Sequence, residues 1–212
     1  MIDSTGSMQN SLTAAYEQVI NMASDSKRVS GLDVEIAAIC FRDPIDSPDD
    51  VHEYHNFTSN IDDIKQFLSK QTAIGGGDTP EDWVGAFNIL FEKLDWGSDE
   101  NVKCLTIIAD APPHGKVFSA DDKYPDEGSK LIQRIKNLVD RNITVKLIAI
   151  NSNPVHSMAI FQEFYKNFGG KICDVNEINL RNVPERSRSK VIGQNIRKQS
   201  ESFTFIASQI TD

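Results

Sequence analysis

The residues best suited to chemistry in this chain are short oxygen-bearing side chains near its start. Asp3, Thr5 and Ser7 alternate along the segment Asp-Ser-Thr-Gly-Ser. One carboxylate and two hydroxyls at alternate positions can face one side of a short turn, and such oxygens suit a hard divalent cation that keeps some of its water. The same residue types also build ordinary turns and helix caps, so this segment alone leaves both interpretations open.

Two later clusters carry similar chemistry, each beside an expected loop. Asp78 and Thr79 follow three glycines and precede Pro80 and Glu81. Asp110 ends an apolar run rich in β-forming residues and is followed by Pro-Pro-His-Gly. Because ligands of α/β proteins bind where strands give way to loops, this recurrence favours one shared cation site.

Three motifs in this chain resemble those of von Willebrand factor A domains, in particular intracellular members of the alpha-kinase-associated type. The motifs are Asp-Ser-Thr-Gly-Ser-Met at 3–8, Gly-Gly-Gly-Asp-Thr-Pro-Glu at 75–81 and Asp-Ala-Pro-Pro-His-Gly at 110–115. The resemblance extends to about residue 175. It implies a metal ion-dependent adhesion site that holds Mg²⁺, with Mn²⁺ or Ca²⁺ as alternative ions.

The resemblance also implies a ligand set. Asp3, Thr5 and Ser7 would supply the first loop of the site, and Asp110 the third. The second loop departs from the family pattern, because Gly77 stands where many members carry a metal-binding threonine. We expect Thr79 or a water molecule to approach the ion there.

Three further residues are candidates for the metal site or its surroundings. Asp78 is expected to cap the following helix, because another carboxylate at the ion would weaken its attraction for an acidic partner. Glu81 could accept hydrogen bonds from loop amides or stabilise the first turn of that helix. His114 could contact the rim of the site or be an ordinary loop residue.

The expected function follows from an ion that the protein does not fully coordinate. Mg²⁺ takes six oxygen ligands, so two hydroxyls and one or two carboxylates leave a position for water or for an acidic side chain. We therefore expect a divalent-metal-dependent protein-interaction module, without catalysis, whose partner protein supplies an Asp or Glu to the metal.

Two other classes of function remain open. A Mg²⁺-dependent phosphotransfer or phosphatase-like enzyme could use Asp3 as its nucleophile. Such enzymes are expected to carry a second Asp where this chain has Thr5, and no Gly-x-x-x-x-Gly-Lys segment is present to cradle a phosphate. The other class is a structural or regulatory domain that uses no metal.

Composition narrows the classes of partner. The chain has 212 residues and a formal net charge of −9, which suits one α/β domain and disfavours nucleic acid as a partner. Basic residues between 181 and 198 are expected on the solvated face of a helix. Neither a leader nor a membrane-spanning apolar run is evident, so we expect a cytoplasmic protein without membrane insertion.

Cysteines and histidines give little further chemistry. Cys40, Cys104 and Cys173 lie in apolar runs without close pairing and are expected to be buried. The remaining histidines are scattered, which disfavours a zinc cluster. The segment 42–50 is rich in Asp and Pro but lacks the spacing of a calcium loop, so it is expected to be an exposed connection without a metal.

Hydrophobic periodicity predicts helices that alternate with strands. Helices are expected at 8–27, 60–70, 80–94, 129–141 and 156–168, and strands at 33–41, 51–57, 102–109, 143–150 and 171–175. This alternation predicts an α/β, Rossmann-like, doubly wound and mostly parallel sheet with helices on both faces. The family resemblance implies six strands in the order 3-2-1-4-5-6, with a hairpin-like third strand as the exception.

This strand order has a direct consequence for the candidate site. Asp3 and Asp110 would end neighbouring strands at the point where the strand order reverses, within reach of one cation. We expect residues 1–180 to form the domain and 181–212 a mostly helical tail that packs on it or extends it. Only two residues precede Asp3, so we expect a truncated first strand and greater stability for a chain extended upstream.

Overall fold

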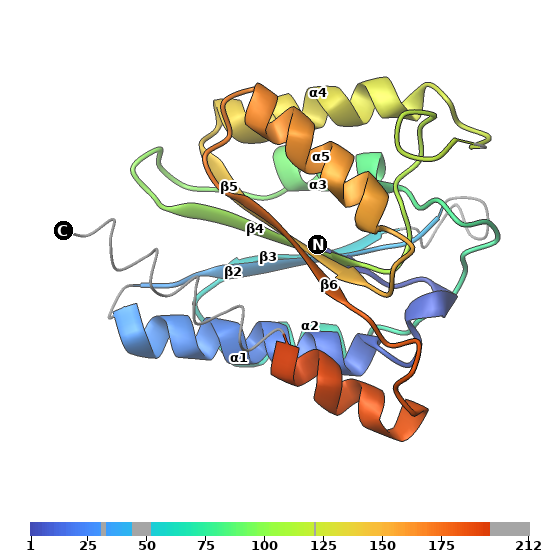
Figure 1. Ribbon diagram of the computed structural model, residues 1–212. Helices are drawn as coiled ribbons and strands as arrows, with labels where there is room; N and C mark the ends of the chain where they lie inside the picture. The colour runs from blue at the N-terminus through green and yellow to red at the C-terminus, as the bar shows by residue number, and fades with distance from the viewer. Residues whose placement is uncertain (31–32, 44–51, 121, 196–212) are drawn as a thin grey trace.

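Six strands form one sheet, and helices cover both of its faces (Figure 1). The computed structural model describes residues 1–30, 33–43, 52–120 and 122–195. The strands are β1 (Ile2–Asp3), β2 (Ile36–Phe41), β3 (His52–Thr58), β4 (Lys103–Ala109), β5 (Ile143–Ile150) and β6 (Cys173–Ile178). The helices are η1 (Gly6–Met8), α1 (Leu12–Ser30), α2 (Ile61–Ser69), α3 (Trp83–Glu92), α4 (Glu127–Asp140) and α5 (Val155–Asn167), and residues 185–195 are also helical.

The strand order is β3-β2-β1-β4-β5-β6, as predicted. β3 pairs with β2 in the antiparallel sense, and all other neighbours are parallel. The two-residue strand β1 lies at the centre, where Ile2 pairs with Cys40 of β2 and with Ile108 of β4. The doubly wound fold and the exceptional third strand are therefore confirmed. Greater stability of an extended chain stays a prediction.

The residue patterns of β5 and β3 fit their places in the sheet. β5 reads Ile-Thr-Val-Lys-Leu-Ile-Ala-Ile and is buried along almost its whole length, because helices cover both faces of a central parallel strand. β3 reads His-Glu-Tyr-His-Asn-Phe-Thr, contains no fully buried residue and forms an edge of the sheet.

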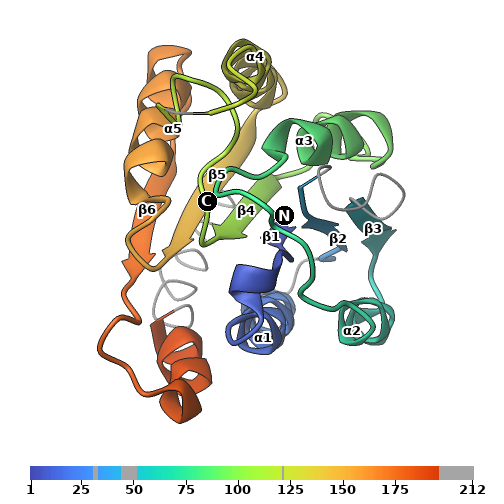
Figure 2. The same cartoon turned by 90° about the vertical axis from the view of Figure 1, so that its right-hand side faces the viewer.

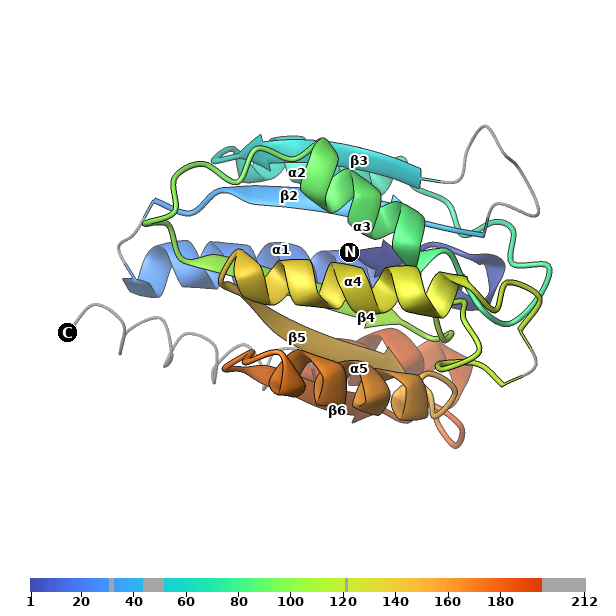
Figure 3. The same cartoon turned by 90° about the horizontal axis from the view of Figure 1, so that it is seen from above.

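Two apolar cores lie on opposite faces of the sheet, and Figure 3 looks onto the face that α3, α4 and α5 cover. The first core packs α3, α4 and α5 against the sheet, and in it the rings of Phe87 and Phe161 stack with centroids 6.1 Å apart. Removing each of these fully buried rings from water stabilises the fold by about 1.5–3 kcal/mol. The second core contains residues of α1 and α2 together with the fully buried Ile192, so the helical residues 185–195 pack on this face.

Several predicted boundaries need correction. α1 begins at Leu12 rather than at residue 8, because Gly6–Met8 forms a separate 3₁₀ turn. α3 begins at Trp83 rather than at Pro80, since the Asp82 carboxylate accepts a hydrogen bond of 2.7 Å from the amide of Gly85. The predicted cap at Asp78 is therefore wrong. The other helices and strands agree with the predictions to within a few residues.

Two predictions of burial are also wrong. Cys104 is exposed, because side chains at the start of β4 alternate between buried and exposed positions, whereas Cys40 and Cys173 are buried. Arg42 and Asp43 are buried, although the segment 42–50 was expected to be exposed. Residues 44–50 of that segment, and residues 196–212 of the tail, lie outside the described residues.

Among the described helices, none combines the length and apolar character needed to cross a membrane.

The cap of α3 makes a testable prediction. Replacing Asp82 with Ala removes an N-cap acceptor and the partner of His52 Nε2, which lies 2.9 Å from Asp82 Oδ2. We expect the free energy of unfolding to fall by about 1–2 kcal/mol, whereas Asp78→Ala in chelator should change it by less than about 0.5 kcal/mol. Urea denaturation measures both. A larger loss in Asp78→Ala would reinstate the cap predicted from the sequence.

The charge of Asp82 adds a pH dependence. Burial alone would raise the pKa of Asp82, but hydrogen bonds from His52 and Gly85 hold it below its ordinary value. A carboxyl whose pKa is lowered on folding stabilises the protein above its unfolded pKa of about 3.9 and loses that effect as pH falls through the folded pKa. We therefore expect Asp82→Asn to be less stable than the unmodified chain at pH 7 and to approach it in stability below about pH 4. A constant difference across this range would contradict the prediction.

Candidate metal centre

Three loops meet at the edge of the sheet where the parallel strands end. Figure 2 looks onto this edge, where the turn after β1, the segment before α3 and the segment after β4 lie beside one another. We call them the first loop (residues 4–8), the second loop (residues 71–82) and the third loop (residues 110–126). They correspond to the three motifs found in the sequence.

Backbone hydrogen bonds join the first loop to the second. The amide of Ile74 donates to the carbonyl of Ser4 at 3.1 Å, and the amide of Gly6 donates to the carbonyl of Gly75 at 3.0 Å. A Cβ atom at Gly6 would lie only 3.0 Å from that carbonyl oxygen, so this close approach favours glycine. Gly75 itself has a φ of 78°, which a residue with a side chain rarely adopts.

The second loop is joined to the third in the same way. The amide of Glu81 donates to the carbonyl of Pro112 at 2.9 Å, and the amide of His114 donates to the carbonyl of Glu81 at 3.2 Å. The glycine-rich and Pro-Pro motifs thus serve as backbone scaffolds. They set the positions of the polar side chains around them.

Asp3, Thr5, Ser7 and Asp110 form one hydrogen-bonded chain. Asp3 Oδ1 accepts from the Thr5 amide at 2.9 Å and from Thr5 Oγ1 at 2.8 Å. Thr5 Oγ1 lies 3.1 Å from Ser7 Oγ, which donates to Asp110 Oδ1 at 2.8 Å. The fold therefore brings together side chains that are 103 positions apart in the sequence.

The two carboxyls of this chain lie in an unfavourable environment for negative charge. Asp3 is 0% exposed and Asp110 is 8% exposed. Burial, followed by the neighbouring Asp110 charge, raises the pKa of Asp3 to about 7, and burial also raises the pKa of Asp110. Asp3 Oδ2 is buried and has no hydrogen-bond partner within the described part of the chain. This donor set fits a divalent cation, which would relieve the repulsion and satisfy the orphaned oxygen.

Glu81 adds a third buried carboxyl to the edge. It is 2% exposed, and its Oε2 atom has no hydrogen-bond partner among the described residues. Burial raises its pKa to about 10, with further contributions from the charges of Asp3, Asp43 and Asp110. A role in the first turn of α3 is wrong for Glu81, because the helix begins two residues later, at Trp83.

The predicted residues of the second loop lie apart from this chain of hydrogen bonds. Thr79 is exposed, and within the described residues its side chain makes no hydrogen bond to Asp3 or Asp110. Its approach to the metal stays a prediction. Asp78 instead forms an ion pair of 3.0 Å with Lys123 through Oδ2.

Asp78 also belongs to a second group of side chains whose ligand atoms could hold a metal ion. Asp43, Asp78 and His114 each place one ligand atom within 4.8 Å of the others. The sequence analysis names Asp78 and His114 as candidates but assigns no metal to the segment that contains Asp43. Asp43 follows the end of β2, so applying to β2 the rule that ligands gather at strand ends would have found it.

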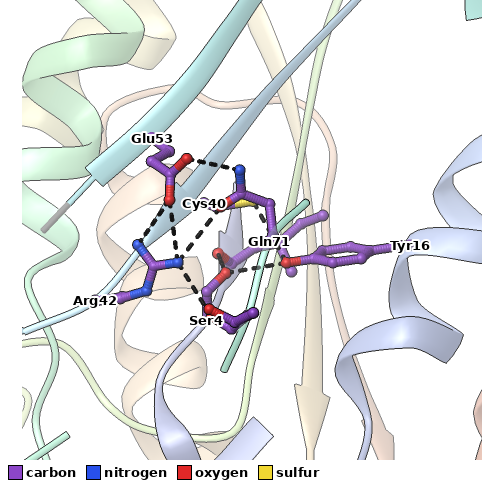
Figure 4. A network of polar contacts seen from close by, with 8 residues as sticks. Ser4, Tyr16, Cys40, Arg42, Glu53 and Gln71 are labelled. Atoms are coloured by element: carbon purple, nitrogen blue, oxygen red, sulfur yellow. Dashed lines mark hydrogen bonds and ion pairs between the residues drawn. The ribbon is translucent and has the colours of Figure 1, made fainter. Parts of the chain in front are cut away.

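A polar network joins Arg42, the residue that follows β2, to β3 and to the start of the second loop (Figure 4). The Arg42 guanidinium lies 3.4 Å from Glu53 Oε1 of β3, and it donates to Gln71 Oε1 at 3.4 Å and to the Thr72 carbonyl at 3.1 Å. Gln71 in turn donates to Glu53 Oε2 at 2.9 Å. Arg42 therefore fixes the start of the second loop and the position of the adjacent Asp43.

Comparison with known proteins gives two partial relatives. No family model matches the chain. It is 29% identical over 197 residues to an ariadne-like RING finger protein of Acanthamoeba polyphaga mimivirus, covering 87% of this chain and 19% of that protein. It is 27% identical to the alpha-protein kinase vwkA of Dictyostelium discoideum, covering 100% of this chain and 34% of the kinase. The chain thus spans 19% and 34% of the lengths of these two relatives.

Solved structures support the fold. The pilus adhesin SpaC from Lactobacillus rhamnosus GG in its open conformation matches 96% of this chain with a TM-score of 0.63 and 13% identity, over 29% of the adhesin. A second form of SpaC matches with a TM-score of 0.60 and 12% identity, over 30% of that chain. At this level of identity the likeness concerns the architecture alone.

The hydrogen bonds of Arg42 lead to a further prediction. Arg42→Lys keeps the charge but removes the planar fork that contacts Glu53, Gln71 and Thr72 together, so we expect a loss of about 1–3 kcal/mol in the free energy of unfolding. We also expect faster amide hydrogen exchange at Ile74 and the neighbouring glycines.

The matched control is Lys65→Met, which breaks an exposed pair with Asp62 and should change stability by less than about 1 kcal/mol. Unchanged exchange in the second loop of Arg42→Lys would show that Arg42 does not position it.

Proposed function

We propose that this chain is a divalent-metal-dependent protein-interaction module of the von Willebrand factor A type. The observation that carries the proposal is the hydrogen bond of 2.8 Å between Ser7 Oγ and Asp110 Oδ1, which joins Asp110 to the chain of oxygen donors that begins at Asp3, whose Oδ2 atom is buried without a hydrogen-bond partner among the described residues. The three sequence motifs, the strand order and the partial similarity to vwkA, whose name suggests such a domain, support the same assignment.

Asp3, Thr5, Ser7 and Asp110 would hold the ion, directly or through water, and Thr79 would complete the second loop. All of these donors are oxygens, which favours Mg²⁺, with Mn²⁺ and Ca²⁺ as alternatives. The bound ion supplies a concentrated positive charge with a coordination position that the protein leaves to solvent or to a partner. Glu81 would lie beside the ligands and add to the negative potential that attracts the cation.

The partner would be a protein that presents an Asp or Glu to this ion. The chain carries a formal net charge of −9, and buried acids surround the site, so an acidic partner has little reason to bind without the metal. Metal binding would neutralise the charges of Asp3 and Asp110 and place a cation at the site, and it would thereby make recognition dependent on the ion. The surrounding loops would supply the remaining specificity.

The proposal involves no catalysis. Asp3, the one candidate nucleophile, is 0% exposed, and its Oδ1 atom already accepts two hydrogen bonds from Thr5. These contacts suit a ligand that is held in place better than a nucleophile that must approach a phosphorus atom in line.

Calorimetric titration of Mg²⁺ and Mn²⁺ into the chelator-stripped chain tests the metal centre. We expect one saturable site whose affinity falls at least about tenfold in Ser7→Ala and below detection in Asp3→Ala and Asp110→Ala, because each change removes one of the oxygen atoms that would hold the ion. Asp62→Ala, which removes an exposed carboxylate of α2, is the matched control and should bind like the unmodified chain.

Circular dichroism establishes that each variant is folded. A folded chain that binds neither ion, or an Asp3→Ala variant that binds as tightly as the unmodified chain, would contradict the proposal.

A further inference from the structure

His114 is held in one orientation by its neighbours. Its Nδ1 atom lies 2.7 Å from Asp122 Oδ1, and the other oxygen of Asp122 accepts from the amide of Gly115. The ring of Tyr124 meets the imidazole edge-on, with centroids 4.7 Å apart and an interplanar angle of 78°. Because an ionised carboxylate only accepts hydrogen bonds, Nδ1 must carry a proton and donate it to Asp122.

The other ring nitrogen is buried and lies near the carboxylate of Asp43. The His114 side chain is 4% exposed, and Nε2 has no hydrogen-bond partner among the described residues. Nε2 lies 3.7 Å from Asp43 Oδ1, which is too far for a hydrogen bond. Two ligands of a tetrahedral zinc ion lie about 3.4 Å apart when each is about 2.1 Å from the metal. The separation therefore fits two ligands of one ion better than a direct contact.

Asp78 completes the group from the second loop. Its Oδ1 atom is buried and has no hydrogen-bond partner in the described part of the chain. Its Oδ2 atom is paired at 3.0 Å with Lys123, whose side chain is 67% exposed and can withdraw into solvent. One oxygen of Asp78 is thus available to a metal ion without breaking its ion pair with Lys123.

We propose that Asp43, Asp78 and His114 form a second metal site, which takes a borderline divalent ion such as Zn²⁺ rather than Mg²⁺. An imidazole nitrogen with two carboxylate oxygens is a donor set that suits zinc and its neighbours in the transition series. Asp122 is the positioning residue, because a carboxylate that accepts from Nδ1 orients a metal-binding histidine and strengthens it as a ligand. Three protein ligands leave a fourth position for water or for another donor.

This second site is separate from the first site, which contains Asp3, Ser7 and Asp110, in its ligands and in its chemistry. It stands whether or not the first site binds Mg²⁺. The two sites share an edge of the sheet, and the buried Glu81 carboxyl interacts electrostatically with Asp3 of one and Asp43 of the other. The protein would therefore hold a nitrogen-containing site beside an all-oxygen site.

The test uses the full chain without a histidine tag, stripped by chelator and kept in saturating Mg²⁺. Zn²⁺ is titrated while the imidazole nitrogens of the four histidines are followed by nuclear magnetic resonance. We expect one equivalent of Zn²⁺ to shift the Nε2 resonance of His114 alone, with Nδ1 remaining protonated. Zn²⁺ binding that leaves the His114 resonances unchanged would overturn the proposal, and this readout needs no variant to fold.

Variants then assign the ligands through a competition assay for Zn²⁺ affinity. We expect at least a tenfold loss in His114→Gln and in Asp78→Asn, and a loss of about 10–100-fold in Asp122→Asn. Asp3→Ala and His156→Ala, which replaces an exposed histidine of α5, should bind Zn²⁺ like the unmodified chain. Equal affinity in a folded His114→Gln variant, or an equal loss in Asp3→Ala, would overturn the second site.

Discussion

The repulsion among buried carboxyls at one edge of the sheet is the constraint on which the rest of this structure depends. Asp3, Glu81 and Asp110 are each 8% exposed or less, and their charges act on one another. Burying an unpaired carboxylate costs several kcal/mol, so such a concentration of acids is stable only when they are protonated or share a cation. A divalent ion shared by these carboxylates would relieve the repulsion while they stay ionised.

The fold holds these groups together by means that do not depend on the ion. Parallel pairing of β1 with β2 and β4 places the ends of three strands side by side. Backbone hydrogen bonds then join the three loops, and Arg42 holds the start of the second loop through hydrogen bonds to Gln71 and Thr72. Two apolar cores of stacked rings and branched side chains support this edge from both faces of the sheet. The arrangement is preorganised, so metal binding would require little rearrangement.

Much of this arrangement could be predicted from the sequence, because local patterns determine it. Strand and helix periodicity predicts the α/β class, and the motif resemblance supplies the strand order that brings Asp3 to Asp110. What could not be predicted depends on contacts between distant residues. Arg42 and Asp43 looked like loop residues by composition, yet they are buried because Arg42 meets partners 11 and 29 positions away. Glu81 looked like a first-turn residue of a helix, yet its backbone is bound to the third loop.

The choice of helix cap illustrates the same limit on a smaller scale. Asp78 and Asp82 both lie before the apolar residues of α3. From the sequence alone, either could be the N-cap of this helix, depending on where it begins. Only the docking of Glu81 against Pro112 decides that the helix begins at Trp83, which leaves Asp82 as the cap and Asp78 near His114. A local assignment thus depends on a contact between segments about thirty positions apart.

A crystal structure of the chain grown with Mn²⁺, with anomalous diffraction recorded at the manganese edge, tests the central claim most directly. The account predicts an anomalous peak within bonding distance of Ser7 Oγ, with the carboxylates of Asp3 and Asp110 bound to the ion or to its water molecules. A structure in which those carboxylates face each other with no peak between them, at an Mn²⁺ concentration that occupies other acidic sites, would contradict it.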